Sequence, residues 1–142
     1  MKIQVVNHSG LPLPEYKTEG SAGMDLCCAE ESVTLDSLER ALISTGLYME
    51  IPVGYEGQVR PRSGLSIKHG VSLINCTGTI DSDYRGELRI PVVNLSKEPY
   101  TIKRGDRIAQ LIFAKVEKGE LIEVESISET DRGHGGFGST GL

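Results

Sequence analysis

The stretch INCTGTIDSDYRGELRI at residues 74–90 holds the residue types best suited to chemistry. Asp81 follows two β-branched residues and stands close to a turn marked by Gly78. A carboxylate at the end of a strand beside a turn can act as a general base that draws a proton from water. An ordinary hairpin loop is also rich in Asp and Gly. The pattern alone leaves both interpretations open.

A second stretch, RPRSGLSIKHG at 60–70, predicts an anion site. Arg62, Ser63 and Gly64 stand where a strand ends and a short helix begins. Free N–H groups at the start of a helix attract anions, and glycine lets a phosphate approach the backbone closely. A serine that only caps the helix would give the same sequence.

Two polar residues interrupt apolar runs. Asp25 lies within SAGMDLCCA, and Gln110 lies within KRGDRIAQLIF. A buried aspartate needs a partner or a cation, and a buried glutamine needs hydrogen-bond partners. Asp25 is therefore a metal or ligand candidate, or else it belongs to a turn or a structural salt bridge. The default for Gln110 is an amide satisfied inside the core.

The chain ends in DRGHGGFGSTGL, where Arg132, Phe137, Ser139 and Thr140 stand among glycines. Glycine loses the most backbone freedom on folding, so a segment of this composition is normally mobile. The composition alone allows either a disordered tail or an arm that closes over a ligand.

The elements that must position these residues are mostly strands. Leu88, Ile90 and Val92 fall on one face of a strand, which is a period of two. Pro91 within that run predicts an edge strand or a bulge. A short helix is expected at 63–70. Strands are expected over the apolar runs at 3–6, 41–51, 54–60, 71–76, 87–95, 107–116 and 120–127.

Length and composition predict one all-β domain over residues 1–130, followed by a Gly-rich arm over 131–142. The chain has 142 residues and a net charge of −5, which argues against a nucleic-acid or anionic-membrane surface. No signal peptide and no apolar run of membrane-spanning length are found. The three cysteines show no zinc spacing, so we expect reduced, small buried side chains in a cytoplasmic protein. The histidines show no ligand spacing either.

Taken together, these stretches resemble the trimeric deoxyuridine triphosphatase (dUTPase) family. The resemblance runs from about residue 11 to the C-terminus, and Thr79 and Lys17 are its small departures, which concern local packing. The matching motifs are, in order, AGMDL, PRSGL, GTIDSDYRGEL, RGDRIAQL and RGHGGFGSTG.

The resemblance implies a jelly-roll fold, a homotrimer with active sites shared between subunits, and Mg²⁺-assisted hydrolysis of dUTP to dUMP and pyrophosphate. Asp81 would orient a water molecule for attack on the α-phosphorus. Tyr84 would lie against the deoxyribose and exclude a 2′-hydroxyl. Asn75 and the 75–80 turn, with Gly78 and Ile80, would read the uracil edge.

The resemblance also implies which residues bind the phosphates and what the C-terminal arm does. Phosphate oxygens would be held by Ser63, Gly64 and Gln110, with Arg62 in support, and Asp25 would help to place Mg²⁺ through water. Mg²⁺ itself would sit mainly on the phosphates. The arm of a third chain would supply Arg132 for the γ-phosphate, Phe137 to stack on uracil, and Gly138, Ser139 and Thr140 for phosphate oxygens.

Two other functions are possible for such a chain. A dCTP deaminase resembles this family in fold but attacks the base, so it should not need the C-terminal arm. A trimeric β protein without activity could use the same scaffold to bind a partner. Ammonia release would mark the first, and partner binding without turnover would mark the second.

Overall fold

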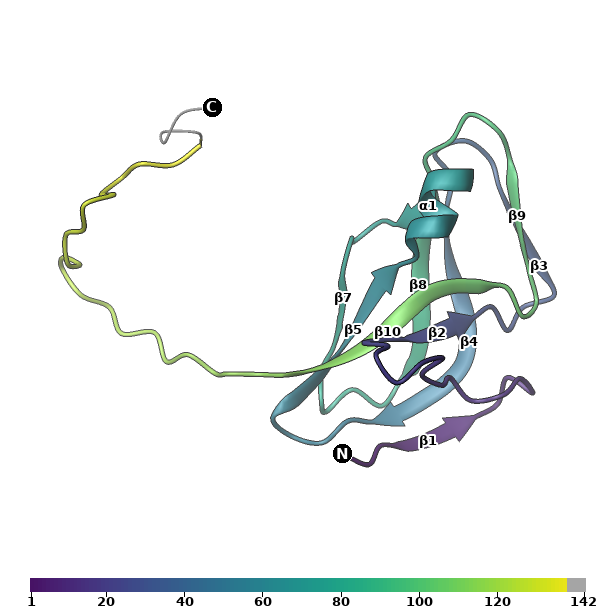
Figure 1. Cartoon of the computed structure of the whole chain (residues 1–142), viewed down its shortest axis with the longest axis horizontal. Helices are drawn as coiled ribbons and strands as arrows, with labels where there is room; N and C mark the ends of the chain where they lie inside the picture. Colours follow the sequence, from purple (N-terminus) through teal and green to yellow (C-terminus); the bar gives the residue numbers. More distant parts are fainter. Residues whose placement is uncertain (138–142) are drawn as a thin grey trace.

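Two four-stranded antiparallel sheets form the body of the protein (Figure 1). The computed structural model describes residues 1–137. The strand order is β1-β4-β8-β6 in one sheet and β2-β10-β5-β7 in the other, and β3 pairs with β9 separately. The elements are β1 (Gln4–Asn7), β2 (Met24–Cys27), β3 (Ser32–Leu35), β4 (Arg40–Glu50), β5 (Tyr55–Pro61), α1 (Ser63–His69), β6 (Val71–Leu73), β7 (Gly78–Ile80), β8 (Glu87–Asn94), β9 (Tyr100–Lys103) and β10 (Arg107–Lys115).

The core lies between the sheets, as the alternating pattern of β8 predicts. Leu88, Ile90 and Val92 are each at most 2% exposed, whereas Arg89 between them points outward. The same cluster of buried apolar residues includes Leu26, Ile43, Leu47, Val59, Leu73, Ile102, Ile108 and Leu111. The prediction of an all-β, jelly-roll-like sandwich is therefore confirmed.

The strand predicted at 120–127 is wrong. In the described part of the chain, no strand follows Lys115, and the segment after it runs away from both sheets (Figure 1). Leu121 and Ile127 are 99% and 86% exposed. An alternating apolar pattern forms a strand only where a neighbouring strand accepts its backbone hydrogen bonds. No strand among the described residues pairs with residues 120–127. Four short strands, β2, β3, β7 and β9, were not predicted.

Pro91 does not lie on an edge strand, because β8 sits between β4 and β6. Its carbonyl accepts a hydrogen bond from the Ile74 N–H just beyond the end of β6. The missing proline N–H therefore falls where pairing with β6 stops. The irregularity in this part of the sheet is in β4, opposite Leu88.

The helix predicted at 63–70 is confirmed as α1, but Ser63 does not cap it. The cap position is Arg62, whose side chain makes no capping hydrogen bond, and Ser63 is the first helical residue. Within residues 1–137, no helix has the length and apolar character that crossing a membrane requires.

The cysteines differ from one another in exposure. Cys28 is buried, Cys27 is half-buried and Cys76 is exposed, and all are free thiols. Burial raises the pKa of the Cys27 and Cys28 thiols, which makes the reactive thiolate rarer. The prediction of buried side chains is correct for Cys28 and wrong for Cys76.

Candidate active site

An ion-pair cluster around Asp25 joins β2, β10 and the start of α1. Its Oδ1 accepts a hydrogen bond from Arg62 Nε at 2.8 Å, and its Oδ2 lies 3.2 Å from Arg107 Nη1. Only 12% of the Asp25 side chain is exposed. A carboxylate this buried needs compensating charge, and two arginines provide it. Of the alternatives for Asp25, the structural salt bridge is therefore present.

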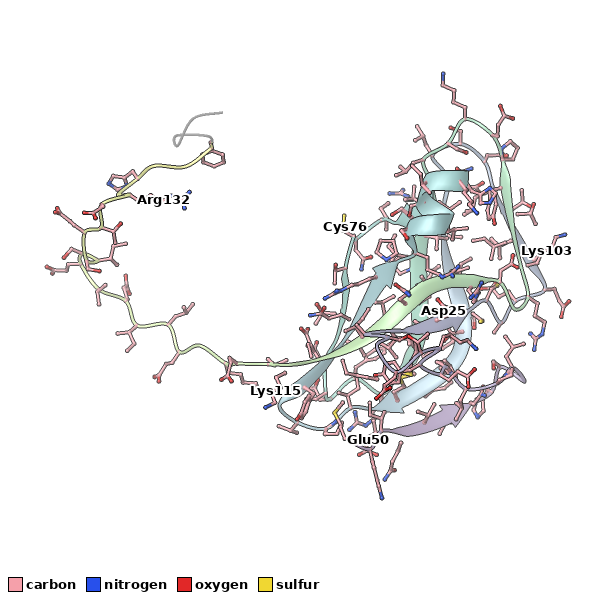
Figure 2. The ribbon with its side chains drawn as sticks, viewed as in Figure 1. Asp25, Glu50, Cys76, Lys103, Lys115 and Arg132 are labelled. Carbon is pink, nitrogen blue, oxygen red and sulfur yellow. The ribbon has the colours of Figure 1, made fainter. Side chains whose placement is uncertain are left out.

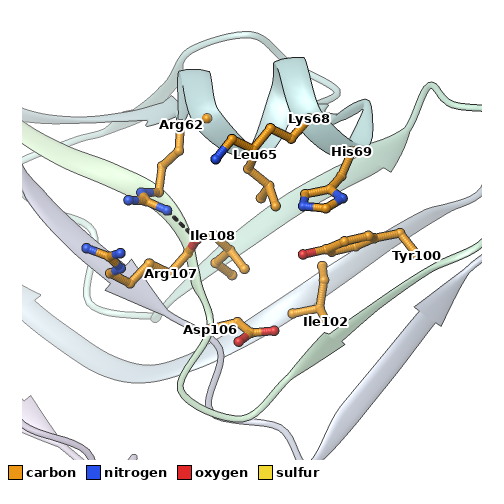
Figure 3. Close-up of a pocket in the computed structure, with 10 residues that line it drawn as sticks. Arg62, Leu65, Lys68, His69, Tyr100, Ile102, Asp106, Arg107 and Ile108 are labelled. Carbon is orange, nitrogen blue, oxygen red and sulfur yellow. Dashed lines mark hydrogen bonds between the residues drawn. The ribbon is translucent and has the colours of Figure 1, made fainter.

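A cationic cavity lies beside this cluster, between α1 and the strands β9 and β10 (Figure 3). Its volume is about 360 Å³, and Arg62, Arg107 and Lys68 line it, with Asp106 as an acidic residue. Arg62 Nη1 also donates to the Arg107 carbonyl oxygen at 3.2 Å, the dashed line in Figure 3. Fixed cations around a cavity favour a polyanionic ligand.

Ser63 and Gly64 are exposed at the start of α1, next to Arg62. Gly64 also lines the cationic cavity. The geometry thus keeps the predicted Arg62–Gly64 group together. Arg107 and Lys68 were not predicted, although Arg107 lies inside the RGDRIAQL stretch and Lys68 lies one helical turn after Gly64.

Gln110 lies on β10 directly opposite Asp25 of β2 and Arg60 of β5. It is only half-buried. Within residues 1–137 its side-chain amide makes no hydrogen bond, so the expectation of an amide satisfied in the core is wrong. Its strand position nevertheless puts it beside the ion-pair cluster.

A separate cavity gathers the residues predicted to read a nucleoside. Asn75, Gly78, Ile80 and Tyr84 all line a space of about 270 Å³. Gly78 lets the Asn75 side chain approach the backbone closely, because a Cβ at position 78 would lie 3.2 Å from Asn75 Nδ2. The structure thus brings these four residues together within one chain.

The Tyr84 ring is fixed from two sides. Its hydroxyl donates to the Glu87 carbonyl oxygen at 2.9 Å. A Cβ on Gly86 would lie 2.5 Å from Tyr84 Cζ, so any other residue at position 86 would displace the ring. A ring held in this way presents a rigid wall to the cavity.

Glu87 and Arg89 also line this cavity and were not predicted. Their side chains pair, with Arg89 Nε 2.9 Å from Glu87 Oε2. Burial raises the pKa of the Glu87 carboxyl, but hydrogen bonds from Ser44, the Gly46 N–H and Arg89 outweigh burial. The net effect is a pKa of the Glu87 carboxyl below its ordinary value, which favours the charged carboxylate.

Asp81 is exposed and lines a third cavity, of about 580 Å³, with Glu56, Asp83 and Lys118. Its carbonyl oxygen accepts from the Tyr84 N–H at 3.2 Å, which closes the turn between them. Among the described residues, none lines both this cavity and the cationic cavity.

In the described part of the C-terminal segment, none of residues 131–137 lines any of the three cavities. Arg132 is on the extended segment, away from Asp25 in the body (Figure 2). Its Nε donates to the Gly135 carbonyl oxygen at 2.8 Å, within the same segment. Phe137 is fully exposed. Gly138, Ser139 and Thr140 lie outside the described residues.

Known proteins resemble this chain over its full length. A Finegoldia magna protein named deoxyuridine 5′-triphosphate nucleotidohydrolase is 63% identical and covers 99% of both chains. A protein of the same name from Fusobacterium nucleatum is 56% identical, over 99% of this chain and 97% of its own.

Solved structures resemble it in fold as well. A Staphylococcus bacteriophage 80alpha dUTPase, determined with dUPNHPP, has a TM-score of 0.90, is 34% identical and covers 99% of both chains. The dUTPase family model matches residues 10–141. The resemblance inferred from the five motifs is confirmed, and the chain belongs to the dUTPase family.

Proposed function

We propose that this chain hydrolyses dUTP to dUMP and pyrophosphate. The observation that carries the proposal is the cavity in which Asn75, Gly78, Ile80 and Tyr84 meet. Its size and its single aromatic wall suit a pyrimidine deoxynucleoside. The relatives named above are nucleotidohydrolases of deoxyuridine triphosphate, and the phage relative was solved with an analogue of that nucleotide.

Specificity for uracil and deoxyribose comes from different parts of this cavity. Asn75 and the backbone of the 75–80 turn pair with the uracil edge, and cytosine leaves those groups unpaired because its 4-position reverses donor and acceptor. Tyr84 excludes the 2′-hydroxyl of a ribonucleotide. The fixed Tyr84 ring supports this role, because only a wall that cannot move discriminates by the size of one atom.

Asp81 orients the attacking water at the α-phosphorus. Aspartate side chains are normally ionised at neutral pH, and Asp81 has no cation bound to its carboxylate among the described residues. A backbone hydrogen bond from the Tyr84 N–H to the Asp81 carbonyl oxygen holds the two residues in one turn.

The triphosphate binds at the cationic cavity. Ser63, Gly64 and Gln110 hold phosphate oxygens, and Arg62 supports them. The two carboxylate oxygens of Asp25 bond one arginine each, Arg62 and Arg107. This supports the arrangement, because it holds the guanidinium groups in place before the ligand arrives.

The family generally depends on a divalent metal ion, and we propose Mg²⁺ for this chain. No cluster of three or more metal-ligating side chains is found among residues 1–137. A site with few protein ligands suits Mg²⁺, which prefers phosphate and water oxygens to a cage of protein ligands. Asp25 would hold it through water, since a carboxylate that accepts two hydrogen bonds still has free lone pairs. When bound, the ion neutralises charge on the phosphates.

Chelation with EDTA is therefore expected to abolish most of the turnover, and added MgCl₂ should restore it. NaCl at matched ionic strength is the control, because it screens charge without bridging phosphate oxygens. Thermal unfolding without nucleotide should not change with EDTA, since no described residue cluster binds the ion alone. Full activity in EDTA would contradict the role of Mg²⁺.

The active site is assembled from a homotrimer. One chain contributes the cationic cavity, a neighbour contributes Asp81 and the nucleoside cavity, and a third contributes the arm over 131–142. Sharing is supported by the separation of the two cavities, because no described residue lines both the cationic cavity and the one that holds Asp81. So does the extended segment after Lys115, which carries exposed Leu121, Ile122 and Val124.

The free cysteines agree with a cytoplasmic protein.

Pyrophosphate release tests the function directly. With Mg²⁺ present, dUTP, dCTP, dTTP and UTP are offered separately, and release is expected from dUTP alone. Ammonia release from dCTP would identify a deaminase instead. Release from none of the four would leave a binding protein on this scaffold, and equal release from all four would contradict the roles of Tyr84 and the 75–80 turn.

A further inference from the structure

One residue that lines the nucleoside cavity, Glu87, has a carboxylate to which the roles above give no task. Glu87 begins β8, and only 15% of its side chain is exposed. Its Oε1 accepts hydrogen bonds from the Ser44 hydroxyl and, at 2.9 Å, from the Gly46 N–H. Its Oε2 accepts from Arg89 Nε at 2.9 Å. Both oxygens are therefore occupied, and two of the three donors belong to β4.

The two donors on β4, Ser44 and Gly46, lie at a bulge of that strand. Ser44 pairs with Arg89 and Tyr48 pairs with Glu87, so three residues of β4 face one residue of β8. Gly46 has a φ of +66°, and a Cβ there would come within 2.6 Å of the Ser9 nitrogen. A bulge interrupts the regular ladder of hydrogen bonds. Side chains make hydrogen bonds across the bulge: the Glu87 carboxylate accepts the Gly46 N–H, and the Thr45 hydroxyl donates to the Leu88 carbonyl oxygen.

The backbone of the same residue holds Tyr84. The Glu87 carbonyl oxygen accepts the Tyr84 hydroxyl at 2.9 Å, and Gly86 lies in contact with the ring. The position of the ring therefore depends on the position of the backbone at residues 86–87. That backbone is joined to β4 in two ways, by the strand pairing of Glu87 with Tyr48 and by the Glu87 side chain, so loss of the carboxylate removes one of the two.

We infer that Glu87 is a positioning residue that holds Tyr84 in place and so sets the discrimination between deoxyribose and ribose. This inference rests on the proposed function, in which Tyr84 excludes the 2′-hydroxyl. Exclusion of one oxygen atom requires a wall fixed to well under its diameter. If the carboxylate is lost, the backbone at residue 87 can shift and the ring can retreat with its hydroxyl still bonded.

The test is the ratio of kcat/KM for dUTP to kcat/KM for UTP, measured on the full chain with Mg²⁺. Glu87→Ala is expected to lower the ratio about tenfold, mainly by raising turnover of UTP. Glu87→Gln should stay within about twofold of the wild type, because its amide oxygen can still accept from Ser44 and Gly46. Rescue by this conservative variant is what the positioning role requires.

Glu39→Ala is the matched control. It removes another carboxylate beside β4, an exposed one whose Oε2 accepts the Asp36 N–H at 2.8 Å. In the described part of the chain its side chain makes no hydrogen bond or ion pair with residues 84–87, so its ratio should equal that of the wild type.

A purely structural role for Glu87 would weaken both substrates alike. An unchanged ratio in a folded Glu87→Ala protein therefore overturns the inference. If that variant does not fold, Ser44→Ala decides, because it removes one donor to the carboxylate. Its ratio is expected to fall about threefold, and an unchanged ratio overturns the inference. A wild-type chain without preference for dUTP overturns the proposed function as well, whereas a selective wild type with unaltered variants overturns the positioning role alone.

Discussion

Replacing Asp81 by asparagine is expected to lower kcat for dUTP by about 10³-fold, in the middle of the range for loss of a general base. The substitution keeps the size of the side chain and its place in the turn, where the backbone carbonyl of residue 81 accepts the Tyr84 N–H. Binding should survive because the nucleoside cavity is intact. Turnover is measured by pyrophosphate release, and the affinity for dUPNHPP by calorimetry.

Asp83→Asn is the control for this experiment. Asp83 is exposed, lies two residues further along and lines the same cavity as Asp81, so both variants lose one negative charge at nearly the same place. Asp83→Asn should keep most of its activity. Equal losses in the two variants would indicate a general electrostatic effect, and near-normal turnover of Asp81→Asn would refute its role as the base.

The fold could be predicted where local pattern and tertiary environment agree. Leu88, Ile90 and Val92 alternate in the sequence and are buried in the structure, because one face of β8 meets the core. The segment 120–127 has a similar pattern but forms no strand. Periodicity reports which side of a segment is apolar, and it does not report whether a neighbouring strand is available.

The residues of the candidate site also fall into two groups, those that the sequence reveals and those that it does not. Residues that act through their own type, such as Asp81, Tyr84 and Arg62, stand out in short polar stretches. Arg107 and Glu87 do not, because their importance comes from partners distant in the sequence. Arg107 bonds Asp25 across β10 and β2, and Glu87 bonds Ser44 across β8 and β4. Such pairs depend on strand register, which a single sequence does not reveal.

Removal of residues 131–142 is expected to lower kcat/KM for dUTP by at least about 10²-fold while leaving the body folded. Among residues 1–137, the last strand ends at Lys115, and no residue of the core cluster lies beyond it. Arg132 Nε donates to the Gly135 carbonyl oxygen within its own segment. The midpoint of thermal unfolding of the nucleotide-free protein should therefore be unchanged, whereas the loss of ligands for uracil and the γ-phosphate should slow catalysis.

Phe137→Ala separates stacking from the other duties of the arm. It should raise KM with a smaller loss of kcat, because the glycines and Arg132 can still close over the phosphates.

Sedimentation of the truncated chain distinguishes a lid from an assembly element. A trimer with little activity agrees with a lid, since closure excludes water and aligns the triphosphate only when nucleotide is bound. A truncated chain that falls to monomers would mean that the arm holds the subunits together, and one with full activity would mean that the site closes without it.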